Sequence, residues 1–195
     1  MLRDTTNTDM VYYIIASPNE GVEAVKEKNF FFTSLFIAAL SLLSSLIGNN
    51  LGLSAEILNG SIAAGFFIRF LFLYLFLFAI SMLYNFIAEI LGCKEKVTRV
   101  LTLLGFSFVP WIFKTPLALI CNGFNLDGLY TFSRPIFVFW IIGLQIFFIK
   151  RIYEFSLFRT LMVYLFPLFF IIFIALLFSL IIFAFIAFNI GRVFM

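Results

Sequence analysis

The sequence predicts an all-α integral membrane protein, a bundle of five transmembrane helices, and three observations support this. Apolar residues make up 64% of the 195 positions, which is more than a soluble domain of this size can hide from water. These residues gather in five long runs. Almost all of the charged residues lie in the short polar stretches between the runs. A hydrophobic run without a central charge is typical of a helix that crosses the bilayer.

Each run is apolar on every face and does not alternate as a barrel strand would. Helices satisfy their own backbone hydrogen bonds, which lipid cannot do. The fourth run has about 15 residues and would rise only about 22 Å. It either recruits Leu129–Phe132 across Pro135, or the bilayer thins around it. The five runs are Phe30–Ile47, Phe66–Leu91, Val100–Cys121, Pro135–Ile149 and Tyr164–Phe188.

The Lys and Arg residues predict the orientation, because they concentrate in the first, third and fifth polar segments. By the positive-inside rule those segments are cytoplasmic, so the N-terminus is cytoplasmic and the C-terminus lies outside. We expect a cytoplasmic head over residues 1–29, which is not a cleavable signal, and a transmembrane domain over 30–195. The basic residues in these segments are Arg3, Lys26, Lys28, Lys94, Lys96, Arg99, Lys150, Arg151 and Arg159.

The head has two short features of its own. Ser17 and Glu20 have the spacing of a capping box, with Pro18 at the first helical position, and predict a short helix from Pro18 to Lys28. We expect this helix to lie on the bilayer surface with Val22 and Val25 facing lipid. The apolar patch Val11–Ile15 just before it should dock on the membrane helices or on a partner.

Two stripes of small or polar residues predict which helix faces meet. Small residues allow close backbone approach, which holds helices together where lipid offers no hydrophobic drive. We expect both stripes to face the bundle interior and the fifth helix to be more exposed to lipid. The stripe on the first run is Ser34, Ala38, Ser41, Ser45 and Gly48, and that on the second is Tyr74, Phe78, Ser81, Asn85, Ala88 and Gly92.

Polar residues inside the runs are candidate functional residues because desolvating them is costly. Asn85, Glu89 and Lys114 are these polar interior candidates. Glu89 is within reach of Lys94 or Lys96 and should form an interfacial ion pair. Lys114 lies between Pro110 and Pro116, which leaves two alternatives. If the helix continues to Cys121, Lys114 is buried and needs a partner such as Asp127 or Glu56; if it ends near Pro116, Lys114 meets headgroups.

The residue types argue against catalysis. The chain has no histidine, which excludes a Ser-His-Asp triad and the usual zinc and copper ligand sets. Cys93 and Cys121 fall at opposite membrane faces and cannot pair within one chain. No phosphate loop, nucleophile elbow or metalloprotease motif occurs. We therefore predict a protein that is not an enzyme, with no catalytic residues, no cofactor and no metal.

The net charge of +3 indicates contact with anionic membrane lipids and not with nucleic acid. We also expect a membrane protein partner or self-association of the chain. The cytoplasmic basic face that would contact lipid or a partner consists of Lys94, Lys96, Arg99, Lys150, Arg151 and Arg159.

Several features follow one another along the chain: Ser17-Pro18-Asn19-Glu20, the segment Val97–Pro110, Trp140, Gly143, Phe155-Ser156 and Pro167. In this order they resemble the Yip1 domain family from Ile15 to the fifth run. That resemblance implies five membrane helices. Eukaryotic members lie in endoplasmic reticulum and Golgi membranes and bind prenylated Rab-type GTPases. This chain lacks their long cytosolic head and their Asp-Leu-x-Gly-Pro motif, so it is more similar to the compact bacterial branch, which implies a bacterial plasma membrane.

Two classes of function fit these observations. The first is a non-enzymatic scaffold or accessory subunit in membrane organisation, trafficking or transport, as the resemblance implies. The alternative is a small transporter or permease-like subunit that moves a lipid or peptide. Pro110 and Pro116 would then mark a discontinuous helix at the transport site. A water-filled cavity around Lys114 and Asn85 would favour the transporter, and a dry bundle would favour the scaffold.

Overall fold

The computed structural model describes residues 6–50 and 61–193, which form helices and no strands. Five helical stretches are long and apolar enough to cross a membrane, which confirms the predicted fold class. They are Phe31–Asn49, Gly65–Ile90, Val97–Gly123, Gly128–Ile152 and Leu157–Phe183. The elements are α1 (Asn7–Ala16), α2 (Pro18–Glu27), α3 (Phe31–Asn50), α4 (Ser61–Ile90), α5 (Val97–Phe106), η2 (Val109–Phe113), α6 (Lys114–Gly123), α7 (Asp127–Ile152) and α8 (Leu157–Val193).

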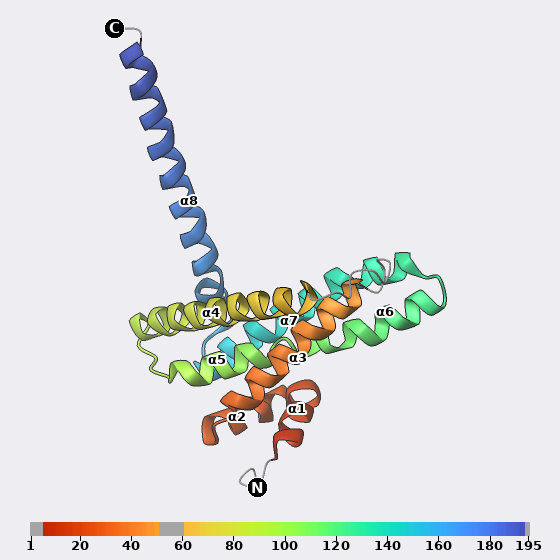
Figure 1. The fold of residues 1–195 in the computed structure, drawn as a ribbon. Helices are drawn as coiled ribbons and strands as arrows, with labels where there is room; N and C mark the ends of the chain where they lie inside the picture. Colours follow the sequence, from red (N-terminus) through yellow and green to blue (C-terminus); the bar gives the residue numbers. More distant parts are fainter. Residues whose placement is uncertain (1–5, 51–60, 194–195) are drawn as a thin grey trace.

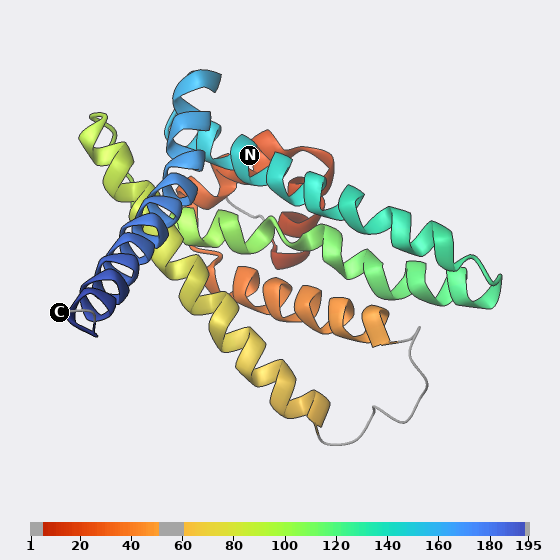
Figure 2. The same cartoon turned by 90° about the horizontal axis from the view of Figure 1, so that it is seen from above.

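The spans differ in how they pack. Figure 2 shows α3, α4, α7 and the α5–η2–α6 segment running beside one another. In contrast, α8 leaves the other helices at a steep angle (Figure 1). Its first turns contact α4 and α7, where Thr160 and Val163 are fully buried. From Leu168 to Phe183 its side chains are exposed, and this span is the least covered by protein of the five, as a helix that faces lipid would be.

The head begins with α1, whose first turn carries a capping box. Thr6 Oγ1 accepts from the Asp9 amide at 3.3 Å, and the Asp9 carboxylate accepts from the Thr6 amide at 2.9 Å. The capping box predicted at Ser17 is wrong, because the Ser17 side chain makes no capping bond. Ser17 also ends α1, where its amide donates to the Tyr13 carbonyl, and its ψ of 65° is not extended. The predicted helix is nevertheless present as α2.

The apolar face of α2 is buried in protein, so the prediction that Val22 and Val25 face lipid is wrong. Both valines are at most 2% exposed, because α2 packs against α1, α5 and α7. Met10 and Ile14 of α1 are fully buried in the same core as these valines. The head is thus packed on the protein's own helices and shares one core with them.

The predicted seam of small residues on α3 faces protein, and all five of its members are buried. It packs on α5, η2 and α6, where Ser34 faces Gly105 and Gly48 faces the Lys114 backbone. The α4 stripe is only partly interior. Ser81 and Ala88 are fully buried, but Phe78 is 43% exposed and Gly92 is exposed. The reason is that α4 packs mainly on α5 with one side and leaves the rest uncovered.

The fourth span has its full length because α7 begins at Asp127 and continues through Pro135. The proline removes one backbone hydrogen bond, and the helix still runs on to Ile152. Of the two alternatives for this run, the structure has the one in which Leu129–Phe132 is recruited.

Three helices end in the same way, with a residue in the left-handed conformation just beyond the helix. These residues are Gly92 after α4, Asn125 after α6 and Glu154 after α7, with φ of 89°, 55° and 55°. The next amide in each case donates back five residues into the helix, as in a Schellman motif. Only Gly92 adopts this conformation without steric cost.

The close approach of α3 to α6 gives a test of the fold. A Cβ at Gly48 would lie 3.0 Å from the Lys114 carbonyl oxygen, whereas a Cβ at Gly143 would meet nothing within 4 Å. We expect Gly48→Ala to lower the unfolding free energy by about 1–3 kcal/mol through overpacking. Gly143→Ala should be neutral or stabilise by up to about 1 kcal/mol. Thermal unfolding in detergent measures both; equal midpoints would contradict the α3–α6 packing.

Candidate functional site

The third span is broken between α5 and α6, and a hydrogen-bonded clamp from α3 holds the break. Pro116 cannot donate to the carbonyl of Ile112, four residues earlier. Ser44 on α3 donates to that carbonyl instead, at 2.7 Å. The Thr115 amide donates to Ser44 Oγ at 3.2 Å, and Thr115 Oγ1 donates to the Ser44 carbonyl at 2.7 Å. Such partners are what lets a broken helix persist in lipid.

Lys114 lies at this break and is only 7% exposed. Its ammonium donates to Ser45 Oγ at 3.0 Å and lies 4.5 Å from the centre of the Trp111 ring. The helix continues past Cys121, so of the two predicted alternatives the structure has the buried lysine. The partners suggested for it, Glu56 and the Asp127 side chain, lie outside the described residues.

The other two interior candidates lie at the opposite end of the spans. We call this the basic end; it consists of α2, the end of α4, the start of α5, the end of α7 and the start of α8. Asn85 Oδ1 accepts a hydrogen bond from the Tyr153 hydroxyl at 3.0 Å. Burial, together with Glu95 and Cys93 nearby, raises the pKa of Tyr153 above its ordinary value, so the phenol keeps the proton that it donates. Asn85 therefore ties α4 to the end of α7.

Ion pairs and one backbone contact complete the basic end. Glu89 pairs with Lys94 at 3.4 Å, which is the interfacial pair that the sequence predicted. Lys26 of α2 pairs with Glu154 at 3.2 Å. Arg99 pairs with Glu95 at 3.0 Å and also donates to the Lys26 carbonyl. The Arg99 contact with the Lys26 carbonyl joins the head to α5, and the Lys26–Glu154 pair joins it to the α7–α8 turn.

The predicted cytoplasmic basic face divides into separate groups. Lys96 and Arg99 line a cavity of about 190 Å³ together with Lys26 and Lys28 of the head. Lys94 is not among the residues that line the cavity and forms its ion pair with Glu89. The remaining three residues do not line the cavity: Lys150, Arg151 and Arg159.

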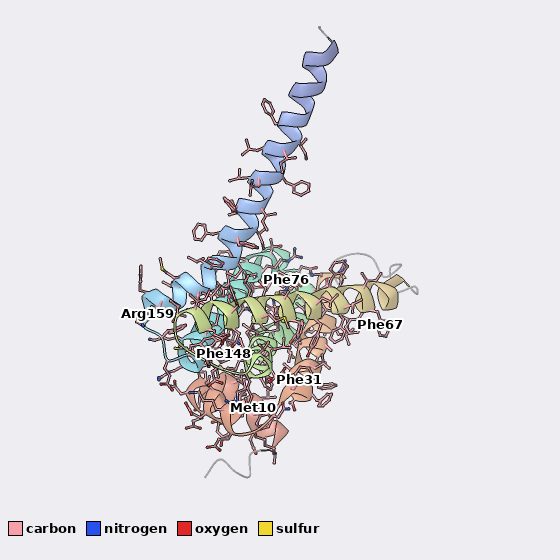
Figure 3. The ribbon with its side chains drawn as sticks, turned by 90° about the vertical axis from the view of Figure 1, so that its left-hand side faces the viewer. Met10, Phe31, Phe67, Phe76, Phe148 and Arg159 are labelled. Atoms are coloured by element: carbon pink, nitrogen blue, oxygen red, sulfur yellow. The ribbon has the colours of Figure 1, made fainter. Side chains whose placement is uncertain are left out.

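These three lie on α7 and α8 and are exposed. The Arg151 guanidinium lies 5.9 Å from the Phe147 ring centre. Figure 3 places Arg159 on the first turns of α8, well apart from Phe31 at the start of α3. The basic end therefore presents one lined cavity and, separately, an open cationic surface.

The sequence reasoning missed Gln145 on α7. Its amide donates to Ser107 Oγ at 3.1 Å and accepts from the Tyr164 hydroxyl at 2.9 Å. The Tyr164 ring also stacks on Tyr84 of α4, with ring centres 6.0 Å apart. This network joins α4, the third span, α7 and α8. A carboxamide in the middle of the fourth apolar run was the signal that could have identified it.

The comparison with known families decides the identity. The sequence model of the Yip1 domain matches residues 12–180. The chain belongs to the Yip1 domain family. The matched Yip1 domain contains the broken third span, the Gln145 network and the whole basic end, so each is a feature of this member's domain itself. No curated protein and no solved structure matches the chain.

Chemically, the described polar groups hold helices together. In residues 6–50 and 61–193, no three His, Cys, Asp or Glu side chains gather at one place. The interior candidates each have a partner that fixes a helix, Asn85 with Tyr153 and Lys114 with Ser45. The groups at the cavity of the basic end, in contrast, face a space that the chain does not fill.

The clamp at the third span is tested by removing the Ser44 hydroxyl. Ser44→Ala leaves the Ile112 carbonyl without its described donor, so we expect a loss of about 1–3 kcal/mol of unfolding free energy. The matched control is Ser179→Ala on the exposed part of α8, which should change stability by less than about 0.5 kcal/mol. Equal unfolding midpoints of the two variants in detergent would show that the clamp contributes nothing.

Proposed function

We propose that this Yip1 domain protein is a non-enzymatic scaffold or accessory subunit of a bacterial plasma membrane. Its basic end lies in the cytoplasm and contacts a membrane protein partner. The observation that supports this most is the rigid attachment of the head. Because α1 and α2 share the core of the spans, they form one fixed surface with the end of α4, the start of α5 and the end of α7.

A scaffold requires such a preorganised surface, since ordering flexible segments on binding costs affinity. The surface is fixed by Lys26–Glu154, by Arg99 with the Lys26 carbonyl, and by Tyr153 with Asn85. Exposed on it are Tyr12, which is 65% exposed, and the cations Lys150 and Arg151. Exposed Tyr and Arg side chains are enriched at protein contact surfaces.

The test is purification of the full chain from its native membrane in mild detergent, with mass spectrometry of what accompanies it. We expect a partner in fixed proportion to the wild-type protein, and its recovery should fall severalfold in Lys150→Gln/Arg151→Gln because complementary charge is lost. Arg134→Glu is the matched control, because it changes the net charge by the same amount about 24 Å away along α7.

Two results would contradict the scaffold role. One is recovery of the wild-type chain with no protein in fixed proportion. The other is equal loss of the partner in the double variant and in Arg134→Glu, which would show that the contact does not lie at the basic end.

The transporter alternative has one observation in its favour, the broken third span. Lys114 is buried there, and the Trp111 indole N–H beside it is buried without a hydrogen-bond partner. Discontinuous helices with buried polar groups are common at transport sites. Against it, the Ile112 carbonyl is bonded to Ser44, and Gly48 packs directly on the Lys114 backbone.

Lys114→Met separates the two functions. For a scaffold, we expect unchanged partner recovery and an unfolding midpoint raised by about 2 °C or more, because the variant removes a buried cation. For a transporter of lipid, the wild-type protein in vesicles would move a fluorescent phospholipid across the bilayer, and Lys114→Met would not. That second outcome would replace the scaffold proposal.

A further inference from the structure

The cavity at the basic end lies between the α2–α3 connection and the start of α5. It has a volume of about 190 Å³. Its inner wall contains Phe30 and Thr102, which are 2% and 1% exposed. A group the size of a phosphate fits a space of this volume.

Four cationic residues line the cavity, against a single carboxylate, that of Glu27. Arg99 and Lys26 are held in place by Glu95 and Glu154, which lie outside the lining. Lys28 and Lys96 are exposed, and the Lys28 ammonium lies 5.4 Å from the centre of the Phe30 ring, so both cations are at the surface of the cavity where a ligand would enter. The four cationic residues are Lys26, Lys28, Lys96 and Arg99.

The start of α5 lies at the same wall, because its second residue, Thr98, lines the cavity. Val97 and Thr98 are its first two residues, and amides at these positions have no partner within a helix. The side chain of the N-cap residue Lys96 makes no capping bond to them. Amides at a helix start together with lysines form a setting that favours an oxyanion.

The position of the cavity along the spans indicates which anion it meets. The first span begins at Phe31, one residue after Phe30, and the third begins at Val97, one residue after Lys96 (Phe31 is labelled in Figure 3). Where two spans begin, the hydrocarbon ends and the layer of lipid headgroups starts. The anion present at that depth is the phosphate of a phospholipid.

We propose that this cavity binds the phosphate of an anionic glycerophospholipid headgroup, with Lys28 and Lys96 as the exposed cations and Arg99 as the fixed one. The site goes beyond the scaffold role and does not depend on a protein partner. A lipid held there would join the head to the first and third spans. The open cations on α7 and α8 remain outside the site.

The test uses the full-length protein, delipidated in detergent and titrated with phosphatidylglycerol or phosphatidylcholine, with binding followed by native mass spectrometry. We expect tighter binding of phosphatidylglycerol, weakened at least about tenfold in Lys28→Gln/Lys96→Gln, since each lysine near a lipid surface contributes measurably. Both lysines are exposed, so the variant should fold. The matched control is Lys150→Gln/Arg151→Gln, which should weaken binding less than about threefold.

Glycerol 3-phosphate is the third probe, because it carries the phosphate without acyl chains. Competition by it at high concentration, with the lipid still preferred, supports the site. If binding of phosphatidylglycerol weakened equally in the two double variants, the cause would be general surface charge, and the proposed site would be wrong. Tight binding of glycerol 3-phosphate with no preference for phosphatidylglycerol would overturn the lipid assignment. The recovery of a protein partner is measured in a separate experiment. If no partner is recovered, the scaffold proposal fails, but the lipid-binding measurement still decides the lipid site.

Discussion

Close packing of α3 on the third span is the contact on which the rest of the structure depends. Small residues along α3 let the two backbones approach until a side chain at Gly48 would press on the Lys114 carbonyl and one at Gly105 would press on Ser34. Only at that distance can Ser44 reach the Ile112 carbonyl, which Pro116 leaves without its helical donor. In lipid an unsatisfied carbonyl is costly, so the break in the third span and the seam on α3 require each other.

The same contact sets the position of the head. Because α3 packs closely on the third span, its first turn lies beside the end of α5, where Ser34 meets Gly105. The short connection from α2 then lies beside the start of α5. Arg99 then donates to the Lys26 carbonyl, and the apolar face of α2 packs on α5 and α7. A segment with the composition of a surface helix becomes part of the protein core. The cavity of the basic end lies between this connection and the first turns of α5.

Particular residues show how far sequence reasoning reached. Hydrophobic runs identified all five spans, and the spacing of small residues identified the buried face of α3. Short-range rules failed at Ser17, because one residue joins α1 to α2 and takes its conformation from both. They failed at Val22 and Val25 because amphipathicity shows that a face is apolar and not what covers it. Gln145 was overlooked, and its partners come from positions 38 residues before it and 19 after it in the chain.

The sequence by itself determined that this chain has five helices long and apolar enough to cross a membrane, resembles the Yip1 domain family and concentrates its cations in three of the polar segments. Hydrophobicity and charge act locally and are readable residue by residue. Only the tertiary structure decided that Lys114 is buried against Ser45 and Trp111, that Asn85 fixes Tyr153, and that four of the cationic residues surround one cavity. These outcomes depend on which faces meet across the bundle, and that is set by packing and hydrogen-bond satisfaction between segments far apart in the chain.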